Sequence, residues 1–120
     1  MKMMSYIKKI RNNYVINQVD HIKLPDFNAS LVTRVKLKFS GRVQKVGFRF
    51  ETCLIAKKLN LTGWVKNNED QSVEAEIQGE KERIDFLINF MKSLKRASVK
   101  HIEQVEIPII KEEKEFIIIK

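Results

Sequence analysis

Hydrophobic and polar residues follow two different periods along this chain. Within residues 33–39, apolar and charged positions alternate, which is typical of a strand with one buried face. Within residues 47–59, apolar positions recur every three or four residues and therefore share one face of a helix. The stretch 40–49 is therefore predicted to connect a strand to a helix.

The same two patterns continue to the end of the chain. Asn60 suits the left-handed position that ends a helix, and residues 67–71 have the composition of a turn. Residues 115–120 are predicted to form either a fifth short strand or an extension of the fourth. The other predicted elements are strands over residues 61–67, 72–78 and 98–107 and a helix over residues 81–95.

The order of these elements is strand, helix, strand, strand, helix, strand. This is the split βαβ order (βαββαβ) of a ferredoxin-like α+β sandwich, which we assign to residues 31–120. We expect an antiparallel sheet with two helices on one face, because the strands alternate instead of being apolar throughout. Folds of this class host enzymes, metal carriers and RNA-binding proteins, so the architecture alone indicates no function.

Residues 1–30 form a separate N-terminal extension. Helical spacing predicts an amphipathic helix over about residues 3–19, and Pro25 begins a linker that ends at Ser30. The predicted apolar face carries Met4, Ile7, Ile10 and Tyr14, and the wetter side carries Lys8, Lys9 and Arg11. Such a helix can bind a membrane surface or nucleic acid, but we favour an accessory element that packs on the domain or frays.

Composition and charge indicate a globular protein that attracts anions. The chain has 23 Lys and Arg against 15 Asp and Glu, and the net charge of +8 does not distinguish small phosphorylated metabolites from nucleic acid. The single cysteine, Cys53, excludes an intrachain disulfide. No apolar run approaches the length of a membrane span, and the N-terminus lacks a signal-peptide core. We therefore expect a monomeric cytoplasmic protein without a membrane partner.

Residues 41–49, Gly-Arg-Val-Gln-Lys-Val-Gly-Phe-Arg, are the strongest candidate for chemistry. With a glycine near each end, such a loop can fold its backbone N–H groups around an anion at the positive end of the following helix. Arg49, in the first helical turn, would add a bidentate contact. Phosphate is the natural ligand, and the alternative is that Arg42, Lys45 and Arg49 are solvated charges.

Conventional catalytic and metal-binding sets are missing from the sequence. The two histidines, His21 and His101, have no Cys or His partner at metal-binding spacing. Ser40 has no histidine in its own segment, which leaves little support for a nucleophilic triad. We expect neither a metal nor a cofactor.

Three segments together resemble the acylphosphatase family: Gly41–Arg49, Gly-Trp-Val-Lys-Asn at 63–67 and Ser-Val-Glu-Ala at 72–75. Their order and spacing match, and the resemblance covers about residues 33–120. It implies a ferredoxin-like hydrolase of small acyl phosphates, in which Arg49 binds the phosphate and Asn67 orients the attacking water. It also implies a phosphate cradle that consists of Arg42, Val43, Gln44, Lys45, Val46, Gly47 and Phe48.

Lys45 departs from the family pattern, which usually has glycine between Gln44 and Val46. If this position is left-handed, a lysine costs about 1–2 kcal/mol there. Two interpretations therefore stay open: an active acylphosphatase, and a weak or inactive anion-binding relative. Nucleic-acid binding is a third and has less support, because the strand centres carry Leu37 and Ala75 instead of the aromatic pair of an RNA-binding sheet.

Overall fold

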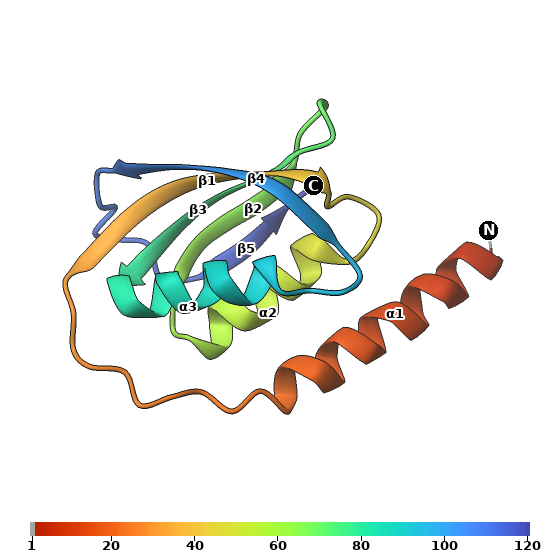
Figure 1. Cartoon of the computed structure of the whole chain (residues 1–120), viewed down its shortest axis with the longest axis horizontal. Coiled ribbons are helices and arrows are strands. Elements are labelled where there is room, and N and C mark those ends of the chain that lie inside the picture. The colour runs from red at the N-terminus through yellow and green to blue at the C-terminus, as the bar shows by residue number, and fades with distance from the viewer. Residues whose placement is uncertain (1) are drawn as a thin grey trace.

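The chain folds into a five-stranded sheet with helices on one side, in a computed structural model that describes residues 2–120 (Figure 1). Side chains are described from residue 5 onward, so the predicted apolar position Met4 lies outside them. The elements are α1 (Lys2–Asp20), β1 (Val32–Arg42), α2 (Phe48–Lys58), β2 (Thr62–Asn67), β3 (Val73–Glu80), α3 (Lys81–Lys92), β4 (Ser98–Ile107) and β5 (Phe116–Ile119).

The strand order is β4-β1-β3-β2-β5, which confirms the ferredoxin-like α+β sandwich. Of the two possibilities for residues 115–120, the structure has the fifth short strand, β5, and not an extension of β4. The prediction of an antiparallel sheet was wrong, because β5 pairs in parallel with β2 at the edge opposite β4, so the sheet is mixed. The strand β4 ends before Pro108, which has no N–H for a sheet, and the chain then crosses to the far edge.

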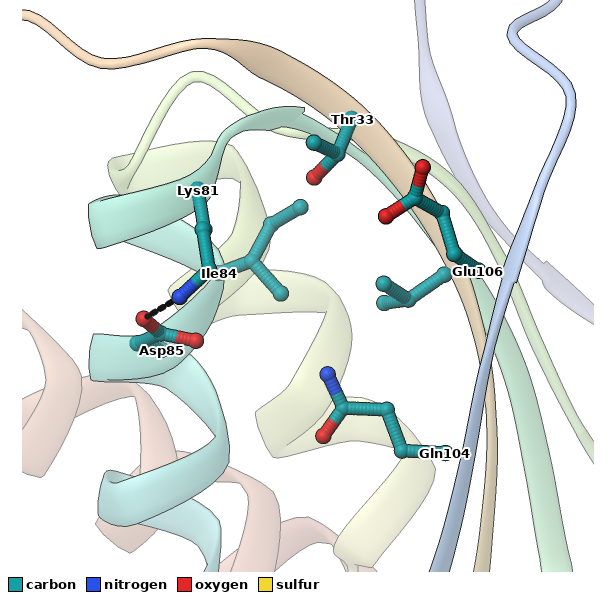
Figure 2. Close-up of a pocket in the computed structure, with 7 residues that line it drawn as sticks. Thr33, Lys81, Ile84, Asp85, Gln104 and Glu106 are labelled. Carbon is teal, nitrogen blue, oxygen red and sulfur yellow. Dashed lines mark hydrogen bonds and ion pairs between the residues drawn. The ribbon is translucent and has the colours of Figure 1, made fainter.

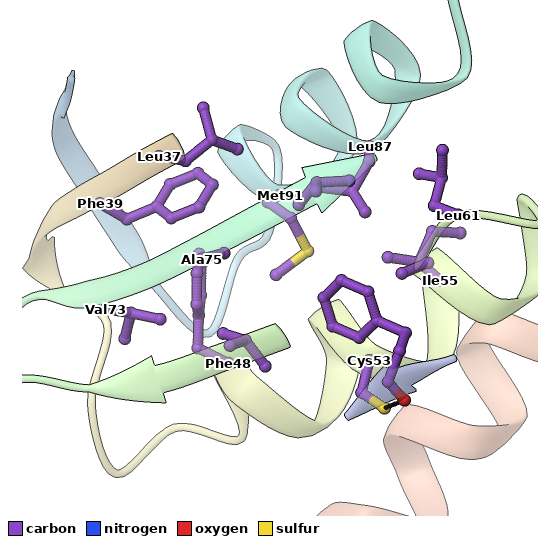
Figure 3. Packing of buried hydrophobic residues seen from close by; sticks show 14 of the residues in the cluster. Leu37, Phe39, Phe48, Cys53, Ile55, Leu61, Val73, Ala75, Leu87 and Met91 are labelled. Atoms are coloured by element: carbon purple, nitrogen blue, oxygen red, sulfur yellow. Dashed lines mark hydrogen bonds between the residues drawn. The ribbon is translucent and has the colours of Figure 1, made fainter. Parts of the chain in front are cut away.

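The side of the sheet that faces α2 and α3 holds the hydrophobic core. Val35, Leu37 and Phe39 of β1 are all buried there, as their alternation predicted. The ring of Phe39 meets the ring of Phe48, at the start of α2, edge to face with centroids 5.1 Å apart (Figure 3). This contact in the core fixes the first turn of α2 against β1.

The opposite side of the sheet is polar and carries one buried cation. Arg34 of β1 is only 1% exposed, and its guanidinium forms ion pairs with Glu76 of β3 and with Glu113. Gln78 adds hydrogen bonds to the backbone of Ile110 in the same crossing segment. These contacts hold the segment between β4 and β5 across the sheet, and so guide the chain to the far edge.

The N-terminal helix forms as predicted, but the face that packs on the domain is not the predicted apolar face. Ile7, Ile10 and Tyr14 are 53–56% exposed, whereas Val15 is fully buried and Val19 is 4% exposed against α2. The inward face therefore consists of residues 11, 15, 18 and 19, which are also at helical spacing. The Lys58 ammonium donates to the carbonyls of Val19, Asp20 and Ile22, which stabilises the negative end of α1.

Residues 21–31, which include the predicted linker at 25–30, are bonded to the start of α3. The backbone N–H of Ser30 donates to Glu80, and the N–H of Lys81 donates to the carbonyl of Leu31. The ring of Phe27 packs edge to face on Phe86. The extension thus follows the helical side of the molecule from α1 to the start of β1 (Figure 1).

Candidate active site

The loop between β1 and α2 is shorter than predicted, because β1 continues to Arg42. Arg42 is exposed and lies opposite Ser98 of β4, so it is a strand residue at the edge of the loop. A bulge at Ser40 and Gly41 allows this extension, and Gly41 has a φ of 126°. The loop between β1 and α2 therefore comprises residues 43–47.

Two residues of this loop have left-handed backbones. Lys45 has a φ of 64° and Gly47 has a φ of 79°, with non-left-handed residues on either side. In a loop with such alternation, successive backbone N–H groups can face the same side, which is the geometry that favours anion binding. Within residues 2–120, no backbone acceptor pairs with the N–H groups of residues 44–47. The side chain of Lys45 is exposed to solvent.

The side chains of the loop anchor it to the domain. Val43 and Phe48 are buried in the core, and Val46 packs against it, so only their backbones are accessible to a ligand. The amide nitrogen of Gln44 donates to the carbonyls of Asn68 at 2.8 Å and Ser72 at 2.9 Å. Gln44 thus fastens the loop to the turn between β2 and β3.

Arg49, in the first turn of α2, points toward the last strand. Its Nη1 donates to the carbonyl of Ile119 at 3.4 Å, and the side chain is half-buried. Ile119 pairs with Lys66, the residue before Asn67 in β2. The parallel strand β5 therefore brings the guanidinium close to the strand end that carries Asn67.

Asn67 lies on the helical side of β2, in alternation with the buried Val65. Its Oδ1 is buried and has no hydrogen-bond partner among the described residues. Asn68 has a different use, because its Nδ2 donates to Ser72 Oγ at 3.0 Å within the turn. A buried carbonyl oxygen without a donor costs about 1–3 kcal/mol, and is an acceptor that a water molecule would satisfy.

The acylphosphatase family model matches residues 35–118, which run from β1 to β5 and make up well over half of the chain. This chain belongs to the acylphosphatase family. The match excludes α1, so the N-terminal helix lies outside the region that defines the family.

Individual acylphosphatases support the same assignment. The chain is 48% identical over 59 residues to the acylphosphatase of Pediococcus pentosaceus. The aligned segment is 49% of this chain and 66% of that protein, just under two thirds. The chain is 40% identical over 77 residues to the acylphosphatase of Geobacillus thermodenitrificans, with 62% of this chain and 82% of that one covered. The crystal structure of acylphosphatase from Bacillus subtilis superposes with a TM-score of 0.69 at 28% identity, over 75% of this chain and 100% of that chain.

Two arginines that sequence reasoning did not place at the acylphosphatase loop contact its carbonyl groups. Arg11 of α1 donates from Nη1 to the carbonyl of Lys45 at 3.4 Å, and Arg96 donates from Nε to the carbonyl of Val46 at 3.3 Å. Burial, together with the charges of Arg96 and Arg49, lowers the pKa of Arg11. The sequence around Arg11 and Arg96 does not indicate that either residue contacts the loop, because both resemble solvated surface charges.

Clefts elsewhere on the molecule do not contribute to this site. A cleft of about 340 Å³ lies between the start of α3 and the strands β1 and β4, lined by Thr33, Val35, Lys81, Ile84, Asp85, Gln104 and Glu106 (Figure 2). A second, of about 440 Å³, lies between the end of α2 and the start of β5. Both are at the end of the sheet remote from the loop, and the Lys81–Asp85 ion pair lies in the wall of the first.

The described residues contain neither a metal-binding cluster nor a membrane-spanning helix. Within residues 2–120, no three His, Cys, Asp or Glu side chains gather in a group that could hold a metal ion. In the same span, no helix is long and apolar enough to cross a membrane.

Proposed function

We propose that this chain is an acylphosphatase that hydrolyses the carboxyl–phosphate bond of small acyl phosphates. The products are a carboxylate and inorganic phosphate. One observation carries the proposal: among the described residues, the backbone N–H groups of the loop have no backbone acceptor and Oδ1 of Asn67 has no partner, while Arg49 lies in the helical turn that follows the loop. Family membership supports the same reaction class.

In this mechanism the cradle binds the phosphoryl group. The N–H groups of the loop donate to its oxygens at the positive end of α2, and Arg49 adds two donors and a positive charge. The carbonyl of Ile119 holds Arg49 by one nitrogen, which restricts the orientations of the guanidinium. The site thereby neutralises charge on the phosphoryl oxygens as the transition state forms.

Asn67 would position the nucleophile. Its Oδ1 accepts a hydrogen bond from a water molecule, which attacks phosphorus opposite the acyl oxygen. A bond forms between the water oxygen and phosphorus, the bond from phosphorus to the acyl oxygen breaks, and the electron pair leaves with the carboxylate. The proton of the water stays with the phosphate product or passes to solvent. A carboxylate is a good leaving group, so this route needs no strong general acid.

The alternative is a weak or inactive anion-binding relative. It is favoured by one observation, the left-handed backbone of Lys45 where the family usually has glycine. The exposed Lys45 side chain supports the active form instead, since the lysine adopts the glycine-like backbone without filling the loop.

Hydrolysis of benzoyl phosphate by the full chain tests the proposal. Arg49→Ala and Asn67→Ala should each lower kcat by about 10²–10³-fold, as the loss of one donor to a developing charge does in other enzymes. Lys36→Ala is the control, because Lys36 pairs with Glu74 on the polar side of the sheet. Parental activity in both variants would overturn the residue roles. A silent parent that binds phosphate would favour the alternative.

A further inference from the structure

The N-terminal helix touches the phosphate loop although it lies outside the family match. Besides its bond to the carbonyl of Lys45, Arg11 packs along Gly47, where an added Cβ would lie 3.0 Å from Arg11 Nε. That Nε is buried and has no partner among the described residues. The neighbouring carbonyl, that of Val46, receives Arg96. Two guanidiniums therefore hold consecutive peptide groups of the loop.

The geometry of the peptide bond gives these contacts a consequence. In a trans peptide the C=O and the N–H point in opposite directions, and the described chain contains no cis peptide. When Arg11 holds the Lys45 carbonyl, the N–H of Val46 must point away from Arg11. When Arg96 holds the Val46 carbonyl, the N–H of Gly47 must point away in the same manner. These contacts also polarise both amides and strengthen them as donors.

These peptides are the ones that most need support. They lie between Lys45 and Gly47, the two left-handed residues of the loop. The cost of a left-handed lysine is of the same order as the strength of one charge-assisted hydrogen bond. The arginine contacts can therefore hold a conformation that the loop would not keep alone.

A second layer of contacts fixes Arg96. Its Nη2 pairs with the fully buried Glu51 of α2, and its Nη1 donates to Gln18 Oε1 at 3.2 Å. The guanidinium also lies 5.6 Å from the ring centroid of Tyr14. Gln18 and Tyr14 both belong to α1, so this helix supports the loop through Arg96 as well as through Arg11.

We propose that Arg11 and Arg96 are positioning residues of the phosphate cradle, and that α1 is thereby part of the phosphate site. This inference rests on the proposed function, since it assigns the two arginines to the same cradle. Together with Arg49, they place three positive charges around one short loop. Anion binding relieves their mutual repulsion, so the loss of Arg11 affects affinity as well as loop order.

The test compares Arg11→Met with Lys8→Met in the full chain. Methionine keeps the apolar stem along Gly47 and removes every donor. Lys8 is exposed on the same helix, so Lys8→Met removes the same charge without a loop contact. The readouts are the affinity for inorganic phosphate and the amide resonances of Val46 and Gly47, both followed by NMR, with benzoyl phosphate kcat and KM alongside.

Arg11→Met should weaken phosphate binding about tenfold, the consequence of one charged hydrogen bond, and should shift both amide resonances in the free protein. Lys8→Met should leave the affinity within about twofold and the resonances unmoved, as expected for a screened surface charge. Because phosphate binds in the ground state, we also expect Arg11→Met to raise KM more than it lowers kcat.

Equal affinity in Arg11→Met and Lys8→Met, with unmoved Val46 and Gly47 resonances, would overturn the inference. The proposed function would then stand or fall separately on the benzoyl phosphate assay. If the parent binds phosphate without hydrolysing benzoyl phosphate, and Arg11→Met weakens that binding, the inference is supported and the proposed enzyme activity is rejected. A parent that neither binds phosphate nor hydrolyses benzoyl phosphate would overturn both proposals, because the loop would then not be a phosphate cradle.

Discussion

Lys45→Gly tests whether the left-handed backbone of Lys45 strains the loop between β1 and α2. Lys45 has a φ of 64° and an exposed side chain, so its replacement removes few contacts and relieves a left-handed non-glycine residue. The relief is about 1–2 kcal/mol, and the extra freedom of glycine in the unfolded chain offsets about 0.4–1 kcal/mol of it. We expect a net gain in the free energy of unfolding of about 0.7 kcal/mol.

This gain corresponds to a small but measurable shift in melting temperature. With about 2.1 cal/mol/K of unfolding entropy per residue, a chain of 120 residues has about 250 cal/mol/K. A gain of about 0.7 kcal/mol then raises Tm by about 3 °C. Gln71 offers a matched control, since it has a φ of 74° and is exposed in the turn between β2 and β3. Gln71→Gly should raise Tm by a similar amount.

The two variants should differ in their kinetics. Lys45→Gly keeps the same backbone conformation, so its kcat for benzoyl phosphate should stay within about twofold of the parent. Its KM should rise about twofold to threefold at low ionic strength and return toward the parent in salt, because an exposed charge acts through a screened field. Gln71→Gly should change neither constant.

Thermal unfolding by circular dichroism and a coupled benzoyl phosphate assay provide these values. A fall in Tm of Lys45→Gly, beside a rise in Gln71→Gly, would refute the strain argument for the loop. A tenfold or greater rise in kcat would show that the lysine distorts the cradle, and would favour the weakly active alternative for the parent.

Three further predictions concern other parts of the molecule. Gly47→Ala should lower the free energy of unfolding by about 1–2 kcal/mol in urea titrations, because an alanine would be left-handed and would press on Arg11; an unchanged midpoint would contradict this. Arg34→Met should cost about 2–4 kcal/mol by the same measurement, since it leaves two partly buried glutamates unpaired, and a loss below 1 kcal/mol would reject that account. Hydrogen bonds from Ser72 and Lys38 hold the pKa of Asp70 below its ordinary value, so its contribution to stability is present above about pH 4 and is lost as the pH falls further. The Tm difference between the parent and Asp70→Asn should therefore shrink from pH 6 to pH 3, and a constant difference would refute the assignment.

The local sequence was sufficient to predict most elements and the faces of the sheet. Alternation in β1 and β3 indicates which side chains are buried, and Asn60 adopts the left-handed backbone expected at the end of α2. These features depend on backbone sterics and on a period of two or 3.6 residues, which neighbours in the sequence determine. For the loop the sequence provided no such answer: it left open whether Lys45 is left-handed, and the φ of 64° comes from the structure.

Which elements pair with one another could not be predicted from local sequence, because it depends on contacts between distant parts of the chain. The six C-terminal residues have a strand pattern, but their pairing with β2 requires the crossing that Arg34 and Gln78 hold. In α1 two faces have helical spacing, and the less apolar one is inward because Val15 packs on α2 while Arg11 reaches the loop.

What the sequence by itself determined is therefore most of the elements, the buried faces of the strands and the stretch that holds the candidate cradle. Only the tertiary structure decided which edge β5 joins, which side of α1 packs inward, and that Arg11 and Arg96 meet consecutive peptides of one loop. The physical reason is that conformational preference acts between neighbours, whereas a hydrogen bond or ion pair between distant residues exists only after the chain has closed the loop between them.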